Sequence, residues 1–299
     1  FKDSLRWISS QDNDFVDREG FPLLGYASAT DCVNVVREVL MEMSKISDPI
    51  QRKRSMCAKF RKEGVVQLGI MGGMTPLMSA MIASRPEIVS LFLEYGAGPF
   101  DAAVSGDNAF MFASMFGRTD NVKFWLKRFP DWDLERKNKV VGGVALGHAV
   151  YMGPHRLELV RVLLEHGASV DYRTDTGSSV LTNVCDSEDG DPELLHFLLK
   201  KKITTNPNCT FRGRTLKWRN IYRLARFLAR NKLTQSGLMT ALAQDSGSTA
   251  LHYAVKRGDV DVVNLLLENG ADPTIKNDLG KSPLDYCDAF PEMEGALKR

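Results

Sequence analysis

Apolar residues recur three and four positions apart in several short segments, which is the spacing of an amphipathic helix. The clearest segment, residues 88–97, reads Ile-Val-Ser-Leu-Phe-Leu-Glu-Tyr-Gly-Ala, and its apolar positions recur at residues 159–168 and 262–271. Each copy ends in Gly-Ala, and a glycine after a helix typically supplies a left-handed C-terminal cap. The pattern therefore predicts a helix over each segment that ends at its glycine.

A second pattern begins with glycine and has Thr or Ser two residues later, Leu four later and a small residue seven later. It occurs at residues 73–80, 247–254 and 280–287, with weaker copies that begin at Gly20, Gly106, Gly142 and Gly177. A hydroxyl at its third position is suited to cap a helix N-terminus, and Pro is favoured in the first turn that follows. The pattern predicts the start of the other helix of a pair.

The spacing of these glycines is regular. It is 33 residues from Gly73 to Gly106 and from Gly247 to Gly280, and 36 and 35 residues in the two steps from Gly106 to Gly177. The 70 residues from Gly177 to Gly247 are close to two periods. A period of this length is typical of helical pairs that stack on one another, because one pair cannot cover its own apolar face.

These motifs and their spacing resemble the ankyrin-repeat family, whose unit is a turn followed by two antiparallel helices. The resemblance is clearest over residues 73–171 and 247–290 and weakest over 201–246. No unit carries the complete Thr-Pro-Leu-His motif, because Met78 and Asp285 replace the His and Ala250 replaces the Pro. The fold class that the resemblance implies is an all-α, ankyrin-type helical repeat solenoid of about six or seven units.

We expect five parts along the chain. They are an N-terminal cap and first unit (1–43), a basic insertion (44–72), central units (73–200), a basic helical insertion or degenerate unit (201–246), and C-terminal units with a cap (247–299).

The resemblance also implies a function. Ankyrin repeats generally bind partner proteins with their turn tips and the concave groove of their first helices, so we expect a non-enzymatic adaptor, scaffold or recognition subunit. The positions that the resemblance assigns to partner binding are Met74, Ile82, Asp107, Met115, Phe116, Val141, Tyr151, Met152, Asp186, Lys256 and Arg257. Seven of these are apolar, and an exposed apolar patch usually marks an interface. The alternative is that they pack between units or lie under the insertions.

The segment from Leu194 to Gln244 has no acidic residue and eleven Lys or Arg. Because the net charge of the whole chain is +2, the rest of the chain has a net charge of about −9. Residues 217–230 are predicted to form a basic amphipathic helix. Its arginines share one face, and they are Arg219, Arg223, Arg226 and Arg230. Three interpretations stay open: a degenerate repeat, a site for an acidic or phosphorylated protein segment, or a site at 200–232 for RNA or acidic lipid.

Other features exclude function classes. No apolar stretch is long enough to span a membrane, no signal peptide is evident, and no nucleotide-binding or hydrolase motif occurs. The five cysteines are scattered, which is typical of reduced thiols. The sequence thus predicts no catalytic residue, metal site or cofactor. It favours an intracellular, cytoplasmic protein, or a nuclear one if Arg52-Lys53-Arg54 is an import signal. A regulatory segment of a larger enzyme is the other interpretation.

Overall fold

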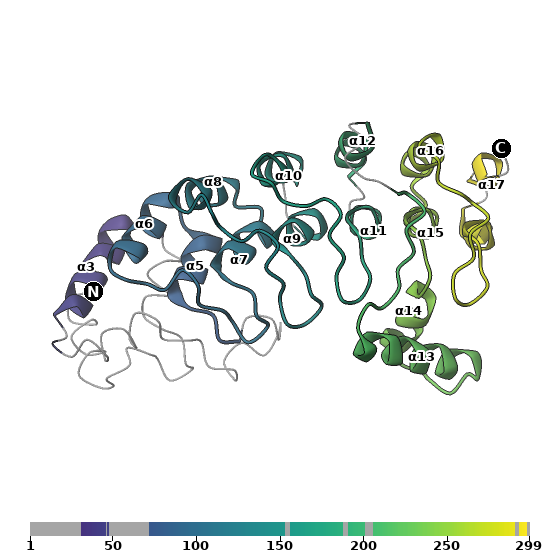
Figure 1. The fold of residues 1–299 in the computed structure, drawn as a ribbon, viewed down its shortest axis with the longest axis horizontal. Helices are drawn as coiled ribbons and strands as arrows, with labels where there is room; N and C mark the ends of the chain where they lie inside the picture. The colour runs from purple at the N-terminus through teal and green to yellow at the C-terminus, as the bar shows by residue number, and fades with distance from the viewer. Residues whose placement is uncertain are drawn as a thin grey trace. The chain divides into compact units, whose positions relative to one another are not determined.

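The computed structural model describes residues 31–45, 47, 72–152, 156–187, 191–200, 206–290 and 293–297. Within these ranges the structure is helical, with one isolated bridge between Ala102 and Asn108 and no β-strand. The chain divides into two compact units, Phe1–Val140 and Val141–Arg299, and each contains stacked helical pairs (Figure 1). The weak motif copy at Gly20 and the basic run at residues 52–54 lie outside the described residues.

The described part of the first unit contains two complete helical pairs and one further helix. Its helices are α3 (Val33–Ser44), α5 (Pro76–Ala83), α6 (Pro86–Glu94), α7 (Ala109–Met115) and α8 (Thr119–Arg128). Helix α5 packs on α6 and α7 on α8 within pairs, while α5 packs on α7, and α6 on both α8 and α3, between pairs. The buried side chains between the helices include Met81, Phe92, Phe110, Phe112 and Trp125.

The second unit repeats this arrangement four times and adds a separate hairpin. The repeated pairs are α9 (Ala145–Tyr151) with α10 (Arg156–Glu165), α11 (Val180–Asp186) with α12 (Pro192–Lys200), α15 (Ala250–Arg257) with α16 (Val260–Glu268), and the 3-10 helix η1 (Pro283–Ala289) with α17 (Glu294–Leu297). The added hairpin consists of α13 (Leu216–Arg230) and α14 (Gly237–Asp245). The described residues therefore contain six pairs, and the all-α repeat architecture predicted from the sequence is confirmed.

Four helices have the same kind of N-terminal cap, in which the N-cap residue and the residue three positions later hydrogen-bond to each other. In each, the N-cap backbone N–H donates to the side chain three residues later, as in a capping box. The accepting atoms are Met78 Sδ, Thr182 Oγ1, His252 Nδ1 and Asp285 Oδ2, at 3.3, 2.7, 3.1 and 2.6 Å from the nitrogens of Thr75, Ser179, Thr249 and Ser282. In α5, α11 and η1 another acceptor thus takes the place of His and reaches the same backbone N–H.

The glycines of both sequence patterns adopt left-handed backbone conformations. The glycines that begin a motif, such as Gly73 and Gly247, have φ of 77° and 83°, and those that end a helix, such as Gly96 and Gly167, have φ of 89° and 93°. Residues with a Cβ rarely adopt this region, so glycine is needed there. The predicted left-handed helix ends are therefore confirmed.

The turns before the first helices are joined to one another by backbone hydrogen bonds. In the first unit Val104 N donates to Gly72 O at 2.9 Å, and Lys139 N donates to Ser105 O at 2.8 Å. In the second unit the equivalent bonds run from Asp175 N to Val141 O at 2.7 Å and from Asp278 N to Ser246 O at 2.9 Å.

Residues 211–214 take the place of one turn in the second unit. Arg214 N donates to Asp175 O at 2.9 Å on one side, and Gly247 N donates to Phe211 O at 2.7 Å on the other. Between these two anchor points the chain leaves the turn, forms the α13–α14 hairpin and returns.

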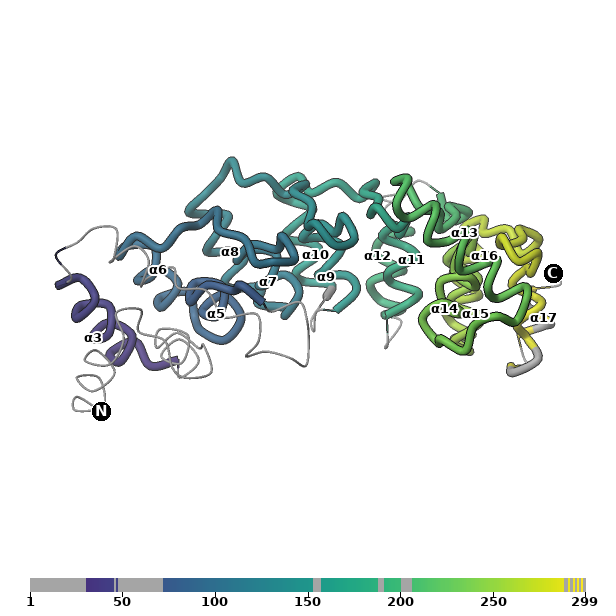
Figure 2. Tube along the Cα trace, turned by 90° about the horizontal axis from the view of Figure 1, so that it is seen from below, coloured from purple at the N-terminus to yellow at the C-terminus, as the bar shows by residue number. Residues whose placement is uncertain are grey.

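The hairpin does not occupy a place among the repeated pairs. Helix α11 packs directly on α15 and α12 on α16, although α13 and α14 lie between them in the sequence. In Figure 1 the hairpin lies below α15, on the side of the turns, and from that side in Figure 2 it lies in front of α15 and α16. Of the interpretations left open by the sequence, a degenerate repeat packed within the stack does not agree with these contacts.

Candidate functional site

The predicted partner-binding residues of the first unit are less exposed than expected. Met74 is 4% exposed, Met115 is 5% exposed and Asp107 is 1% exposed. The expectation that these three face solvent is wrong, because the methionines pack into the core and Asp107 Oδ1 accepts a hydrogen bond from Asn138 Nδ2 at 3.1 Å. Ile82 and Phe116 are half-buried. The first unit therefore lacks the predicted apolar surface at two of its four apolar positions, Met74 and Met115.

The predicted residues of the second unit come together along one edge. Tyr151 and Met152 are 43% and 49% exposed at the end of α9, and Asp186 is exposed at the end of α11. Lys256 and Arg257 are half-buried at the end of α15. Because α9 packs on α11 and α11 on α15, these helix ends follow one another in space. We call these five residues the α9–α11–α15 edge; the sixth, Val141, is half-buried in a turn.

Polar contacts connect the three helices of this edge. The Tyr151 hydroxyl forms a hydrogen bond with the Asp186 carboxylate. Arg257 Nη1 donates to the backbone carbonyl of Cys185 at 3.4 Å, which joins α15 to α11. Lys256 Nζ lies 3.6 Å from Asp245 Oδ1, at the end of α14. The edge is thus an ordered network.

The charges of the edge are partly removed from water. Desolvation raises the pKa of Asp186 and of Asp245, and the negative charge of Asp245 raises that of Asp186 further. Desolvation lowers the pKa of Lys256, whose Nζ lies 5.3 and 5.0 Å from the ring centroids of Tyr253 and Tyr286. Charges in a medium less polar than water interact more strongly with a complementary group than solvated charges do.

The chemistry that the edge offers is binding chemistry. Burial raises the pKa of the Cys185 thiol to about 12, so this nearby sulfur stays protonated and weakly nucleophilic at neutral pH. In the described part of the chain no group of three or more His, Cys, Asp or Glu side chains is placed to hold a metal ion. The edge can therefore bind a partner by apolar contact with Met152, by ring contact with Tyr151 and by charge pairing. The charged side chains are Asp186, Lys256 and Arg257.

The four arginines of α13 divide into two pairs. Arg226 Nη1 donates to Ser246 Oγ and to Asp278 Oδ2, both at 2.6 Å, and Arg230 Nη2 donates to Asp278 O at 2.8 Å. Among the described residues, Arg219 donates only to Gly213 O, at 3.2 Å, within its own segment. Arg223 is exposed and makes no hydrogen bond or ion pair with a described residue. One pair therefore attaches the hairpin to the turns, and the other remains accessible.

Three residues important to this region were absent from the predicted set. The Asp278 carboxylate pairs with Arg226 and Arg212 and accepts a hydrogen bond from Ser246. Asp278 lies two residues before Gly280, and Asp245 lies two residues before Gly247. This shared position before the motif glycine could have been used to predict both aspartates from the sequence. Tyr222 is 2% exposed and its hydroxyl has no hydrogen-bond partner among the described residues. Its position depends on Phe211, whose ring centroid is 5.7 Å away, and no local sequence signal indicates this contact.

Comparison with known proteins identifies the repeat. The family model for ankyrin repeats (many copies) matches residues 238–287. The mitochondrial disaggregase of Rattus norvegicus is 49% identical over 45 residues, which are 15% of this chain and 7% of that protein. The nuclear factor NF-kappa-B p105 subunit of Gallus gallus is 29% identical over 206 residues, 65% of this chain and 20% of that protein. The chain thus spans a fifth or less of the length of these relatives.

Two solved structures have the same fold over nearly the whole chain. The ankyrin repeat domain of Bcl-3, described as a member of the IkappaB protein family, has a TM-score of 0.60 at 22% identity and covers 94% of this chain and 99% of that domain. The human ASB11 ankyrin repeat domain has a TM-score of 0.59 at 17% identity and covers 92% and 96%. With the motifs, the left-handed turn glycines and the stacked pairs, these likenesses show that the chain has the ankyrin-repeat fold, and residues 238–287 match the family model itself.

Proposed function

We propose that the chain is a non-enzymatic protein–protein interaction module that binds a partner protein through the α9–α11–α15 edge. The observation that carries this proposal is the placement of Tyr151 and Met152, both more than two-fifths exposed, beside the partly desolvated charges of Asp186 and Lys256. Aromatic and Met side chains are enriched at binding surfaces, and charges beside them provide specificity.

The edge is also ordered before a partner arrives. The hydrogen bonds of Tyr151 and Arg257 hold their side chains on α11, so binding requires less ordering of these groups. An intracellular, cytoplasmic location belongs to the same proposal. It is supported by the thiols of Cys185 and Cys209, which are not joined in disulfides.

The test compares proteins captured from an extract of the native cells by the wild type and by the Tyr151→Ala/Met152→Asp variant. Met41→Asp is the matched control, because Met41 is 49% exposed, as Met152 is, but lies on α3 in the first unit. We expect at least one protein to lose about tenfold in capture with the double variant, equivalent to about 1.4 kcal/mol, and to be unaffected by the control. The same proteins captured equally by all three would refute the proposal.

A further inference from the structure

The α13–α14 hairpin carries the largest share of exposed apolar side chains. Of the eleven large hydrophobic residues that are exposed in the described part of the chain, five lie between residues 216 and 238. They are Leu216, Leu224, Phe227, Leu233 and Leu238, which are 76, 51, 58, 63 and 66% exposed. Single exposed apolar residues need no explanation, but a concentration of this kind usually marks a surface that contacts something.

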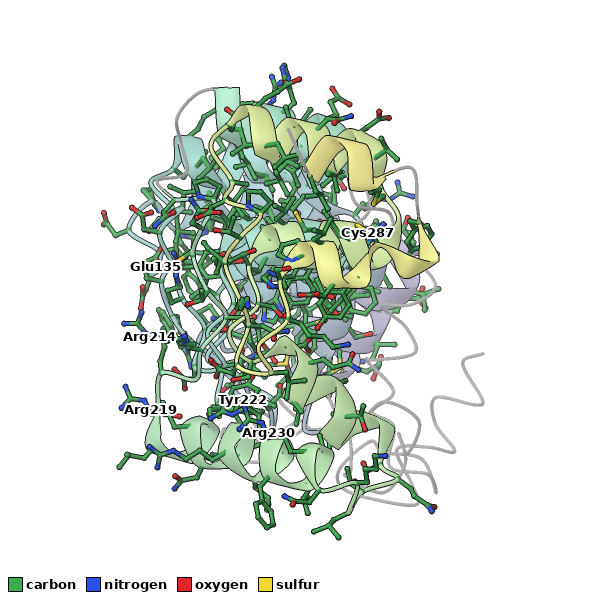
Figure 3. All side chains as sticks on the ribbon, turned by 90° about the vertical axis from the view of Figure 1, so that its right-hand side faces the viewer. Glu135, Arg214, Arg219, Tyr222, Arg230 and Cys287 are labelled. Carbon is green, nitrogen blue, oxygen red and sulfur yellow. The ribbon has the colours of Figure 1, made fainter. Side chains whose placement is uncertain are left out.

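These side chains lie on the outside of the hairpin. Tyr222 and Ala225 form the buried side of α13, and Figure 3 shows Tyr222 on the side that faces the repeats. Helical spacing of eight and eleven residues places Leu224 and Phe227 on the same outer side as Leu216. Leu233 and Leu238 belong to the connection between the two helices and the first turn of α14. We call these five residues the outer ridge.

The attachment of the hairpin fixes the direction of the outer ridge. Arg226 and Arg230 hold α13 to Asp278, and Arg226 also donates to Ser246. On the inner side Tyr222 packs against Phe211 with their rings edge to face. Because the inner side is occupied by these contacts, α13 cannot rotate to bury the outer ridge without breaking them.

Positive charge lies beside the outer ridge and is not neutralised by its own segment. Arg219 and Arg223 are exposed and do not contact Asp278, and Lys217 and Lys232 lie at the two ends of α13. No acidic residue occurs between Leu194 and Gln244. The surface therefore combines aliphatic and aromatic side chains with unopposed cations along a helix of 15 residues, about 22 Å long.

We propose that the outer ridge of the hairpin binds the surface of a membrane that contains anionic phospholipid. Helices that lie in the membrane interface combine Leu and Phe on one side with Lys and Arg beside them, and their affinity rises with anionic lipid. The ridge residues are more than half exposed on the outer side of the hairpin, which suits a broad surface better than an inserted peptide. Nucleic acid is less well matched, because four of the five ridge residues are leucines, which neither stack on bases nor hydrogen-bond to them.

The test uses co-sedimentation of the full chain with vesicles of phosphatidylcholine alone or mixed with phosphatidylserine. We expect binding to the mixed vesicles only. Leu224→Asp/Phe227→Asp should lower the partition coefficient at least about tenfold, because two apolar side chains no longer enter the interface. Arg219→Gln/Arg223→Gln should lower it about fivefold for each charge removed. Met41→Asp, which places a new charge on the first unit, should have no effect.

Several outcomes would overturn the proposal. These are equal binding to both vesicle types, no binding to either, and binding that the ridge variant does not weaken. Binding of single-stranded RNA or poly-glutamate that depends on Arg219 and Arg223 but not on Leu224 and Phe227, without vesicle binding, would assign the hairpin to a soluble polyanion instead. Circular dichroism of each variant verifies that the fold is retained. The partner-capture assay is independent of all these results, because the α9–α11–α15 edge is unchanged in the hairpin variants.

Discussion

Protonation of His252 should weaken the second unit as the pH falls. The side chain is 0% exposed. Its Nδ1 accepts a hydrogen bond from Thr249 N at 3.1 Å and lies 2.9 Å from Thr249 Oγ1, and its Nε2 lies 3.1 Å from Lys281 O. This pattern assigns the neutral imidazole with its proton on Nε2. A proton on Nδ1 would remove the acceptor that caps α15.

The magnitude follows from the pKa of this imidazole. Desolvation lowers the pKa of His252 from 6.5 to about 4 in the folded chain. Because the folded pKa lies below the unfolded one, the unfolded state binds the proton first. The stability contribution of neutral His252 is therefore complete above the unfolded pKa and is lost progressively as the pH falls toward 4. Near pH 5 the loss in free energy of unfolding is about 2 kcal/mol.

Urea unfolding of the wild type and of His252→Gln, followed by circular dichroism near pH 7.5 and near pH 5 at constant ionic strength, measures this loss. Gln keeps an acceptor for Thr249 N but does not titrate in this range. The carboxylates of Asp186 and Asp245, whose raised pKa gives the opposite sign of pH dependence, are present in both proteins and cancel. We expect the wild type to lose about 2 kcal/mol more than the variant. An equal loss in both proteins would refute the reasoning.

Two further predictions concern the turns. Asp278→Asn removes the charge that holds Arg226. Because both side chains are 23% exposed, the loss in stabilising free energy should be only about 1 kcal/mol. It should be measured as faster hydrogen exchange in α13 with unchanged exchange in α9. Gly177→Ala should lower stability by about 1–3 kcal/mol more than Gly280→Ala, measured by thermal unfolding. Both glycines have positive φ, but a Cβ at Gly177 would clash with the backbone carbonyl of Arg212, whereas one at Gly280 meets no described atom. Equal costs for the two glycine variants would contradict the predicted clash.

The local parts of the fold were accessible from the sequence. Helix starts at Thr75, Ser179, Thr249 and Ser282 follow from a capping hydroxyl with an acceptor three residues later, and these contacts depend on only four consecutive residues. The turn glycines are equally local. Helix positions and the period of the array could therefore be predicted without knowledge of any distant contact.

The surface was harder to predict, because exposure depends on neighbouring repeats. Met74 and Met115 occupy positions that the ankyrin pattern places outward, but both are buried. The division of the α13 arginines depends on Asp278, about 50 residues later in the chain. The sequence correctly placed a basic amphipathic helix here, while only the packing of α11 on α15 separates an insertion from a degenerate repeat.

The direct packing of α11 on α15 has a consequence for chain entropy. In an array of this kind nearly all stabilising contacts join residues about one repeat apart, so order spreads from each repeat to the next. At this junction the separation is 70 residues between Gly177 and Gly247, against 35 between Gly142 and Gly177. Doubling the length of a closed loop costs only about 0.6 kcal/mol. An element as large as a helical hairpin can therefore be carried at a turn while the repeats on either side remain neighbours.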